Sequence, residues 1–126
     1  MIVGIGIDTI EIERFAHWHS YSLKTLQRIF SNEEITYCLS QKNKSAERFA
    51  ARFATREALY KAYSYIPNVK KVSFLAFCKN VSIQKIEGRP YITNTYIAKD
   101  LRIHLSLAHS NTHATAFVII EKENQQ

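Results

Sequence analysis

The sequence predicts an α+β fold with one long helix at its centre. Residues 48–62 are rich in alanine and contain no proline or glycine, which favours a continuous helix. Residues 103–109 alternate between apolar and polar side chains, and residues 114–120 are almost all apolar, which is typical of strands. The length of 126 residues suits one domain, so we expect a single domain over residues 1–126.

The chain begins with a predicted strand that contains two glycines. Residues 2–8 are otherwise aliphatic and end at Asp8. Because side chains two positions apart share a strand face, Gly4, Gly6 and Asp8 face the same way. Glycine in a strand marks a bulge or a close approach by another group. Alternatively, Asp8 begins a capping box that ends at Glu11 and starts a helix.

The segment before the central helix is expected to be mainly helical. Residues 11–30 have a helical pattern with a break at residues 17–21. The sequence Ser-Asn-Glu-Glu at residues 31–34 is a capping box that opens a helix through Leu39. Ser45 is expected to cap the central helix.

After the central helix, strands are expected to predominate. Residues 72–77 and 81–86 are strand candidates, and residues 87–90 form a turn. A short helix is expected at residues 96–101. Residues 110–112 form the hairpin turn between the last two strands.

Composition limits the compartment and the partners. The net charge is 17 − 11 = +6, which favours an acidic partner such as nucleic acid, an anionic membrane, an acidic protein or a phosphorylated substrate. Cys38 and Cys78 are too few for a disulfide framework and too far apart for a zinc knuckle, so we expect reduced thiols. The N-terminus lacks a signal-peptide pattern, and no apolar run approaches the ~20 residues that span a bilayer. We therefore expect a cytoplasmic protein with no membrane partner.

The central helix carries charges on its apolar stripe. Glu57 and Lys61 lie there at i,i+4 spacing, and a buried charge costs several kcal/mol unless it is paired or bound to a metal. The helix alone leaves two interpretations open, a salt bridge between these two residues or a functional carboxylate. On another face, Arg48, Arg52 and Arg56 repeat every four residues, and we interpret this ridge as a solvated basic surface.

Two carboxylates suggest a hard cation. Asp8 and Glu57 are accompanied by no compact set of histidines and cysteines. Mg²⁺ is usually held by one or two carboxylates, several waters and the phosphates of a substrate. This favours phosphoryl chemistry, with Lys61 placed one turn beyond Glu57 to meet a phosphate oxygen.

Other chemistries have weaker support. Zinc at His104, His109 and His113 is disfavoured because these residues would not all point the same way on a hairpin. Ser106 near a histidine suggests acyl transfer, but the sequence has no Gly-x-Ser-x-Gly motif. Nucleic-acid binding fits the charge, but no RNA-recognition signature occurs.

Three motifs in order resemble one enzyme family. They are the Gly-x-Gly strand ending at Asp8 and followed by Arg14, the helix segment Arg-Phe-Ala-Thr-Arg-Glu-Ala-Leu-Tyr-Lys-Ala at residues 52–62, and His-Leu-Ser-Leu-Ala-His at residues 104–109. Together they resemble the holo-acyl-carrier-protein synthases, the small class of 4′-phosphopantetheinyl transferases. The capping-box segment at residues 28–34 is also similar to that family, and the resemblance covers nearly the whole chain.

The resemblance implies a fold and a reaction. The fold would be the 4′-phosphopantetheinyl transferase fold, an antiparallel sheet packed on a long central helix, in a homotrimer with active sites at the subunit interfaces. The reaction would be the Mg²⁺-dependent transfer of phosphopantetheine from coenzyme A to a serine of apo acyl carrier protein. It would release adenosine 3′,5′-bisphosphate and support fatty acid biosynthesis.

The resemblance also implies roles for residues. Asp8 and Glu57 would hold Mg²⁺, and Lys61 would bind the coenzyme phosphates and complete the catalytic set. The general base would be Glu57 or a water beside it; we favour the water because a metal-bound carboxylate has a lowered pKa. Further coenzyme contacts would come from the β-strand residues His104, Ser106 and His109. The acidic carrier protein would dock on the basic residues Arg14, Lys24 and Arg28.

Two departures from the family pattern are visible. Residues 63–66 read Tyr-Ser-Tyr-Ile where the family commonly has a glycine-rich turn, and Ala108 replaces a hydroxyl-bearing residue. Glycines would let backbone N–H groups approach a phosphate, so coenzyme contacts from this turn are not expected. The competing hypotheses are a catalytically silent module that binds carrier proteins and a small basic protein that binds nucleic acid.

Overall fold

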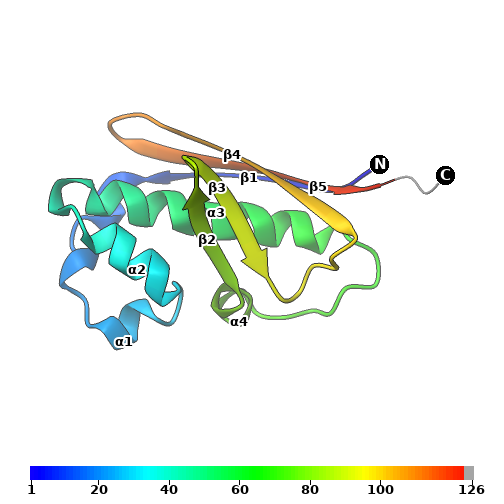
Figure 1. Ribbon diagram of the computed structural model, residues 1–126, viewed down its shortest axis with the longest axis horizontal. Helices are drawn as coiled ribbons and strands as arrows, with labels where there is room; N and C mark the ends of the chain where they lie inside the picture. Colours follow the sequence, from blue (N-terminus) through cyan, green and yellow to red (C-terminus); the bar gives the residue numbers. More distant parts are fainter. Residues whose placement is uncertain (124–126) are drawn as a thin grey trace.

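A three-stranded sheet covers one side of the long helix. The computed structural model describes residues 1–123, and strands β1 (Ile2–Glu11), β5 (His113–Lys122) and β4 (Leu101–His109) form an antiparallel sheet in the order β1-β5-β4. This sheet packs along helix α3 (Ser45–Ser64), as Figure 1 shows. The predicted α+β class, with an antiparallel sheet on a central helix, is confirmed.

Smaller elements pack around the rest of α3. A second sheet consists of one antiparallel hairpin. No helix in residues 1–123 is both long and apolar enough to cross a membrane. The elements are η1 (Ile12–Phe15), η2 (Trp18–Ser20), α1 (Leu23–Leu26), α2 (Asn32–Leu39), η3 (Lys42–Lys44), α4 (Phe74–Lys79), β2 (Val81–Ile86) and β3 (Arg89–Asn94).

Two glycines allow β1 to lie directly on the backbone of α3. A β-carbon on Gly4 would collide with the carbonyl group of Ala62, and one on Gly6 would collide with that of Ala58. Two residues of strand and four residues of helix both advance about 6 Å, so β1 and α3 run in opposite directions in step. The close approach expected at these glycines is confirmed, and Asp8 faces α3 one step further along.

The predictions for residues 8–30 were partly wrong. β1 continues to Glu11 because it stays paired with β5, so Asp8 does not begin a capping box. After β1, residues 12–26 are helical only in short pieces, namely two 3-10 helices and the four-residue α1, so the interrupted helical character is confirmed and the expected extent of the helix is wrong. The reason is tertiary packing, since Phe15 and Trp18 turn inward against Phe53 with ring centroids 5.5 and 6.1 Å from it.

The predictions for residues 72–101 were partly wrong. Residues 81–86 form β2 as expected, and the turn leads into β3. Residues 74–79 are helical instead of extended, because the Ser73 hydroxyl accepts a hydrogen bond from Ala76 N and caps α4. Residues 96–100 form an irregular loop, in which the Asn94 side chain accepts a hydrogen bond from Ile97 N, and not the expected short helix.

The capping predictions had mixed outcomes. The capping box at Ser31 and Glu34 opens α2 as expected. Ser45 does not cap α3: it is the first helical residue, Lys44 occupies the N-cap, and the Ser45 hydroxyl has no hydrogen-bond partner in the described part of the chain.

A buried ion pair lies at the centre of the molecule. Arg56 and Glu34 are both fully buried, and Arg56 Nη1 donates to Glu34 Oε2 at 2.8 Å. Arg56 also donates to the carbonyl oxygens of Val81 and Cys78, so it joins α2, α3, α4 and β2. Arg52 is buried as well. The prediction of a solvated arginine ridge is therefore wrong for these two residues, because their partners come from distant segments.

Candidate functional site

The fold brings Asp8 and Glu57 together. Asp8 lies on the face of β1 that packs against α3, beyond the two glycines that set the close approach. Glu57 lies on α3, half-buried at the edge of the sheet. The charge of Asp8 acts on the Glu57 carboxyl. The two residues are 49 positions apart in sequence, and the packing of β1 on α3 makes them neighbours.

Lys61 bonds to β1 and not to its helical neighbour. Its Nζ atom donates to Asp8 Oδ1 at 3.2 Å and to the carbonyl oxygen of Ile7 at 3.0 Å. Among residues 1–123, Lys61 forms its ion pair with Asp8 and none with Glu57. The hypothesis of a simple salt bridge between Glu57 and Lys61 is therefore wrong. Lys61 remains half exposed, so a ligand can reach its side chain.

The electrostatics of the site favour a cation. Burial raises the pKa of Glu57, the charge of Asp8 raises it further, and Lys61 and Arg14 only partly offset both effects. Two carboxylates that repel each other bind a divalent cation readily, because the cation relieves the repulsion.

The donor set fits Mg²⁺ better than a transition metal. No group of three or more His, Cys, Asp or Glu side chains lies close enough to hold a metal within residues 1–123. Mg²⁺ commonly takes one or two carboxylates and fills its remaining positions with water and substrate phosphates. Asp8 and Glu57 can supply those two ligands, and Lys61 lies beside them to neutralise a phosphate.

A cavity lined by basic residues, here called the basic cavity, lies at the β4 edge of the sheet, opposite to the β1 edge that carries Asp8. It has a volume of about 620 Å³ and lies between β4, the first half of α3 and the tip of the β2–β3 hairpin. Its lining includes Lys44, Arg48, Arg52, Lys85 and His109, with Glu47 bonded to His109 at 2.9 Å. Such a concentration of cations suits an anionic ligand.

The cations of the basic cavity are held around one aromatic ring. The guanidinium groups of Arg48 and Arg52 lie 4.0 and 4.5 Å from the centre of the Tyr37 ring. Burial alone would raise the pKa of Tyr37, but Lys85, Arg48 and Arg52 together lower it. Arg52 Nε is buried, makes no hydrogen bond within residues 1–123 and lies 3.8 Å from Glu34 Oε2, so it belongs to the buried ion pair at the centre of the molecule. The cations that an anionic ligand can reach in this cavity are therefore chiefly Lys44, Arg48 and Lys85.

The sequence alone does not reveal this cavity. The periodicity of Arg48 and Arg52 predicted a solvated ridge instead. The residues that could have indicated the cavity are the aromatic Tyr37 and the basic Lys44 and Lys85, which lie in other segments. No sequence pattern shows that these segments meet.

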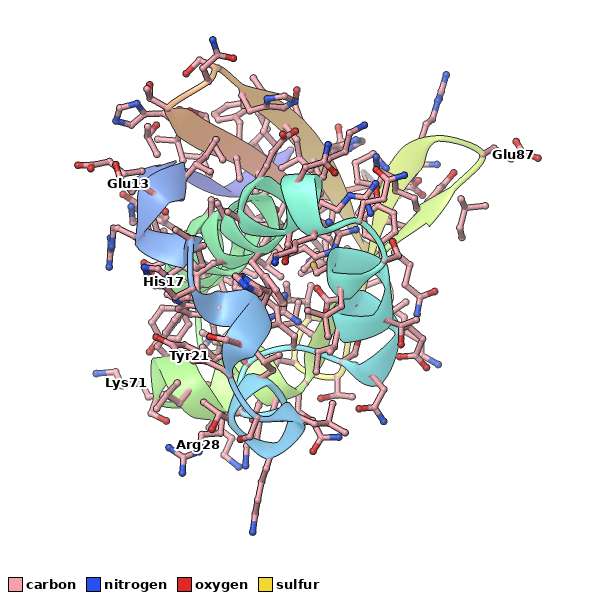
Figure 2. All side chains as sticks on the ribbon, turned by 90° about the vertical axis from the view of Figure 1, so that its left-hand side faces the viewer. Glu13, His17, Tyr21, Arg28, Lys71 and Glu87 are labelled. Atoms are coloured by element: carbon pink, nitrogen blue, oxygen red, sulfur yellow. The ribbon has the colours of Figure 1, made fainter. Side chains whose placement is uncertain are left out.

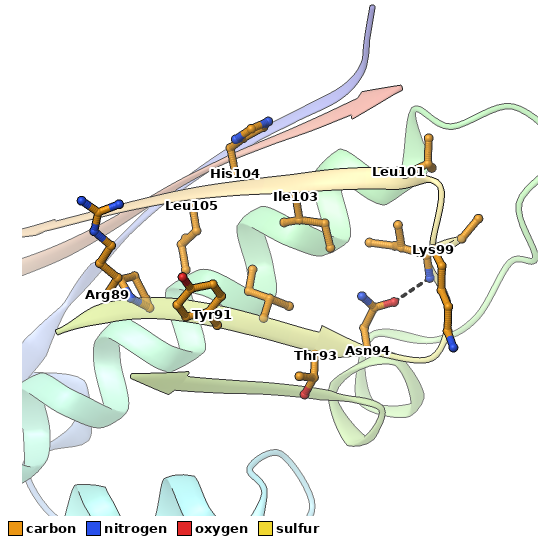
Figure 3. Close-up of a pocket in the computed structure, with 13 residues that line it drawn as sticks. Arg89, Tyr91, Thr93, Asn94, Lys99, Leu101, Ile103, His104 and Leu105 are labelled. Atoms are coloured by element: carbon orange, nitrogen blue, oxygen red, sulfur yellow. Dashed lines mark hydrogen bonds between the residues drawn. The ribbon is translucent and has the colours of Figure 1, made fainter. Parts of the chain in front are cut away.

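The three predicted coenzyme contacts lie on β4, away from Asp8. Ser106 and His109 border the basic cavity. His104 borders a neighbouring cavity of about 610 Å³ between β3 and β4. Figure 3 shows the His104 ring on the side of β4 opposite to Ile103 and Leu105. His104 bonds to Glu121 at 3.0 Å. A single chain therefore does not bring these residues to the carboxylate pair.

The predicted docking residues are exposed. Arg14 lies on η1, Lys24 on α1 and Arg28 just after α1. None of them is within 4.0 Å of a carboxylate in residues 1–123. Figure 2 shows Arg28 at the surface that η1, η2 and α1 form. The arrangement offers positive charge to an acidic partner.

Comparisons with known proteins agree over nearly the whole chain. Residues 4–118 match the family model of the 4′-phosphopantetheinyl transferase superfamily. A holo-(acyl-carrier-protein) synthase of Geobacillus sp. (strain WCH70) is 38% identical, and the match covers 97% of this chain and 98% of that protein. One from Treponema denticola is 36% identical, with 96% and 99% covered.

Solved structures are also similar. The holo-(acyl-carrier-protein) synthase of Bacillus anthracis, solved in complex with CoA (3′,5′-ADP), has a TM-score of 0.76 and 32% identity. The match covers 98% of this chain and 99% of that one. The acyl carrier protein synthase of Mycobacterium tuberculosis has a TM-score of 0.70 and 28% identity, with 98% and 100% covered.

Proposed function

The chain belongs to the 4′-phosphopantetheinyl transferase superfamily, and we infer that it acts as a holo-(acyl-carrier-protein) synthase. It transfers 4′-phosphopantetheine from coenzyme A to a serine of apo acyl carrier protein and releases adenosine 3′,5′-bisphosphate. The reaction supports fatty acid biosynthesis. The observation that carries this assignment is the meeting of Asp8, Glu57 and Lys61 where β1 lies on α3. Residues 1–126 act as a single domain, and the compartment is the cytoplasm.

Asp8 and Glu57 would hold a Mg²⁺ ion. When bound, the ion neutralises charge on the pyrophosphate of coenzyme A. Lys61 leaves Asp8 and donates to a phosphate oxygen, which adds a second positive charge beside the reacting phosphorus. The serine oxygen bonds to the β-phosphorus while the bond to the adenosine bisphosphate breaks. The serine proton passes to a water beside Glu57, because a metal-bound carboxylate has a lowered pKa and is a poor base.

The basic cavity receives the phosphates of the adenosine part of coenzyme A. Lys44, Arg48 and Lys85 line this space and offer positive charge to the phosphates. Guanidinium groups suit phosphate because they donate in a planar fork. Ser106 and His109 border this space from β4, in agreement with a role in coenzyme binding.

The working form is a homotrimer with each active site between two subunits. The carboxylate pair lies at the β1 edge of the sheet and the basic cavity at the β4 edge, so the two halves of the proposed site are on opposite edges of one chain. A neighbouring copy can bring its β1 edge to this β4 edge. The outer sheet face supports such contact, since Ile5 and Ile7 are 45% and 55% exposed beside Ile119 and Phe117.

Two rival functions make different predictions. A silent carrier-binding module would bind the carrier protein without modifying it. A nucleic-acid-binding protein would bind DNA or RNA with steep salt dependence. The carboxylate pair favours the transferase over both rivals. Neither carrier binding nor nucleic-acid binding needs two neighbouring carboxylates such as Asp8 and Glu57.

A mass assay tests the proposal. Apo acyl carrier protein is incubated with the chain, coenzyme A and Mg²⁺, and its mass is followed. We expect the gain of one phosphopantetheine group, loss of the gain with EDTA, and loss in Asp8→Asn and Glu57→Gln. Glu33→Gln removes an exposed carboxylate outside the site and should retain activity. No gain in mass with tight carrier binding would favour the silent module.

A further inference from the structure

Two tyrosine hydroxyls anchor the connection between α3 and α4. Tyr63 Oη donates to the carbonyl oxygen of Lys70 at 2.6 Å, and Tyr60 Oη donates to that of Val72. Tyr63 is buried and begins the segment that departs from the glycine-rich turn common in the family. Because the carbonyl groups before and after Lys71 are both bonded to α3, the backbone of Lys71 is held in place while its side chain is exposed.

The anchored connection lies beside Glu57. Phe74, which follows it at the start of α4, packs on Phe53 and Tyr60 with ring centroids 5.7 and 5.4 Å away. Those two residues lie one turn before and one turn after Glu57 on α3, so Phe74 covers the helix next to that carboxylate. The charge of Arg14, on η1, also acts on Glu57. The approach to Glu57 therefore passes both η1 and the anchored connection.

The cations of the anchored connection are free. Neither Lys70 nor Lys71 has a carboxylate within 4.0 Å among residues 1–123. Figure 2 shows Lys71 at the same side of the molecule as His17 and Tyr21, which belong to the η1–α1 region. Ring contacts link the two regions, since Phe53 touches both Trp18 and Phe74. The basic docking surface thus continues onto the connection.

We propose that Lys71, assisted by Lys70, binds acidic side chains next to the target serine of the carrier protein. The proposal rests on the proposed function, in which that serine must reach the phosphorus held beside Glu57. The protein surface around the serine then covers the anchored connection. Opposite charges there raise the rate and the specificity of association. The tyrosine anchors fix the backbone that carries these lysines, which lowers the entropic cost of ordering this segment on binding.

Steady-state kinetics of Lys71→Glu and Lys70→Glu test the proposal. We expect the KM for apo acyl carrier protein to rise about three- to tenfold at low salt, with kcat and the KM for coenzyme A unchanged. The increase should shrink in 1 M salt, where the Debye length is about 3 Å. Tyr63→Phe, which removes one anchor, should give a smaller rise. Lys42→Glu makes the same charge change on η3, at the opposite end of α3, and should leave this KM unchanged.

The outcomes separate this proposal from the proposed function. An unchanged carrier KM in Lys71→Glu, or a rise in the coenzyme KM alone, overturns the docking role. If the wild-type chain modifies no carrier protein, the proposed function fails, and carrier binding by fluorescence anisotropy decides the docking role. If Lys71→Glu binds the carrier protein more weakly than Lys42→Glu does, the docking role is retained. If the two variants bind equally, or neither binds, the docking role is overturned.

Discussion

Lys61 on α3 bonds to Asp8 on β1, with 3.2 Å between Nζ and Oδ1. Without a ligand, the lysine thus occupies one of the two carboxylates that the proposed metal needs. The Lys61 ammonium group neutralises part of the negative charge of the site. A metal ion must therefore share Asp8 with Lys61 or displace Lys61 from it. Lys61 then becomes available to a phosphate group.

The first prediction concerns this contact. Lys61→Ala removes the positive charge beside Asp8, so Mg²⁺ should bind more tightly in the absence of coenzyme A. The same change removes a charged donor to phosphate, so the KM for coenzyme A should rise about tenfold or more. Isothermal titration with Mg²⁺ and steady-state kinetics measure the two effects, and Lys42→Ala is the control. Weaker Mg²⁺ binding in Lys61→Ala would contradict the prediction.

The second prediction concerns pH. The raised pKa of Glu57 means that the folded state binds its proton more tightly than the unfolded state does. The resulting stability is fully present below the unfolded pKa and is lost as pH rises through the folded pKa. Without metal, Glu57→Gln should remove this loss, which urea unfolding at a series of pH values can measure. Asp8→Asn should lower the pKa of Glu57, which carbon-13 NMR of the carboxyl group can follow.

Metal binding should respond to pH in the opposite direction. Protons compete with Mg²⁺ for Glu57, so Mg²⁺ affinity should increase as pH rises through the raised pKa. In Asp8→Asn, the increase should occur at lower pH, with weaker binding throughout. A Mg²⁺ affinity that does not change over the range in which Glu57 titrates would argue against Glu57 as a ligand.

The third prediction concerns Gly6. In Gly6→Ala, the added methyl group meets the carbonyl group of Ala58, so β1 must move away from α3. Overpacking of this kind typically costs about 1–3 kcal/mol of unfolding free energy. Activity should fall further, because Asp8 moves with the strand. Gly88→Asn is a control for the unfolding free energy alone, since nothing lies near that position and Asn tolerates its positive φ. It is no control for activity, because Gly88 borders the basic cavity.

The fourth prediction concerns the buried pair of Arg56 and Glu34. Arg56→Met removes the closer partner of the buried Glu34 carboxylate and leaves it only Arg52 Nε at 3.8 Å, so the loss should approach the about 3–5 kcal/mol that breaking a buried ion pair typically costs. Urea unfolding should show this loss, whereas Arg102→Ala, which breaks the exposed pair with Glu123, should show a much smaller one. Similar losses for both variants would contradict the structural role of the buried pair.

The fifth prediction concerns assembly. Light scattering should give a mass about three times that of the 14.6 kDa chain. Ile7→Glu places a charge on the outer face of the sheet and should reduce both the mass and the activity. Leu75→Glu changes a residue of similar exposure on α4 and should remain trimeric. A wild-type chain that is active as a monomer would exclude the shared active site.

Local patterns were sufficient for much of the fold. The uninterrupted alanine-rich stretch predicted α3, and the alternation from residue 103 predicted β4, because both depend on residues close in sequence. The capping box at Ser31 predicted the start of α2 for the same reason. The order of the motifs also pointed to Asp8, Glu57 and Lys61, and to the family that the comparisons confirm.

Tertiary structure decided the rest, because it depends on contacts between segments far apart in the chain. Phe15 and Trp18 pack on Phe53, and this interrupts a region whose sequence favours helix. Arg56 is buried because Glu34, on another helix, meets it. The sequence by itself determined which residues could form the site. Only the packing of β1 on α3 decided that Lys61 bonds to Asp8 and not to Glu57, since that packing alone sets which charges are neighbours.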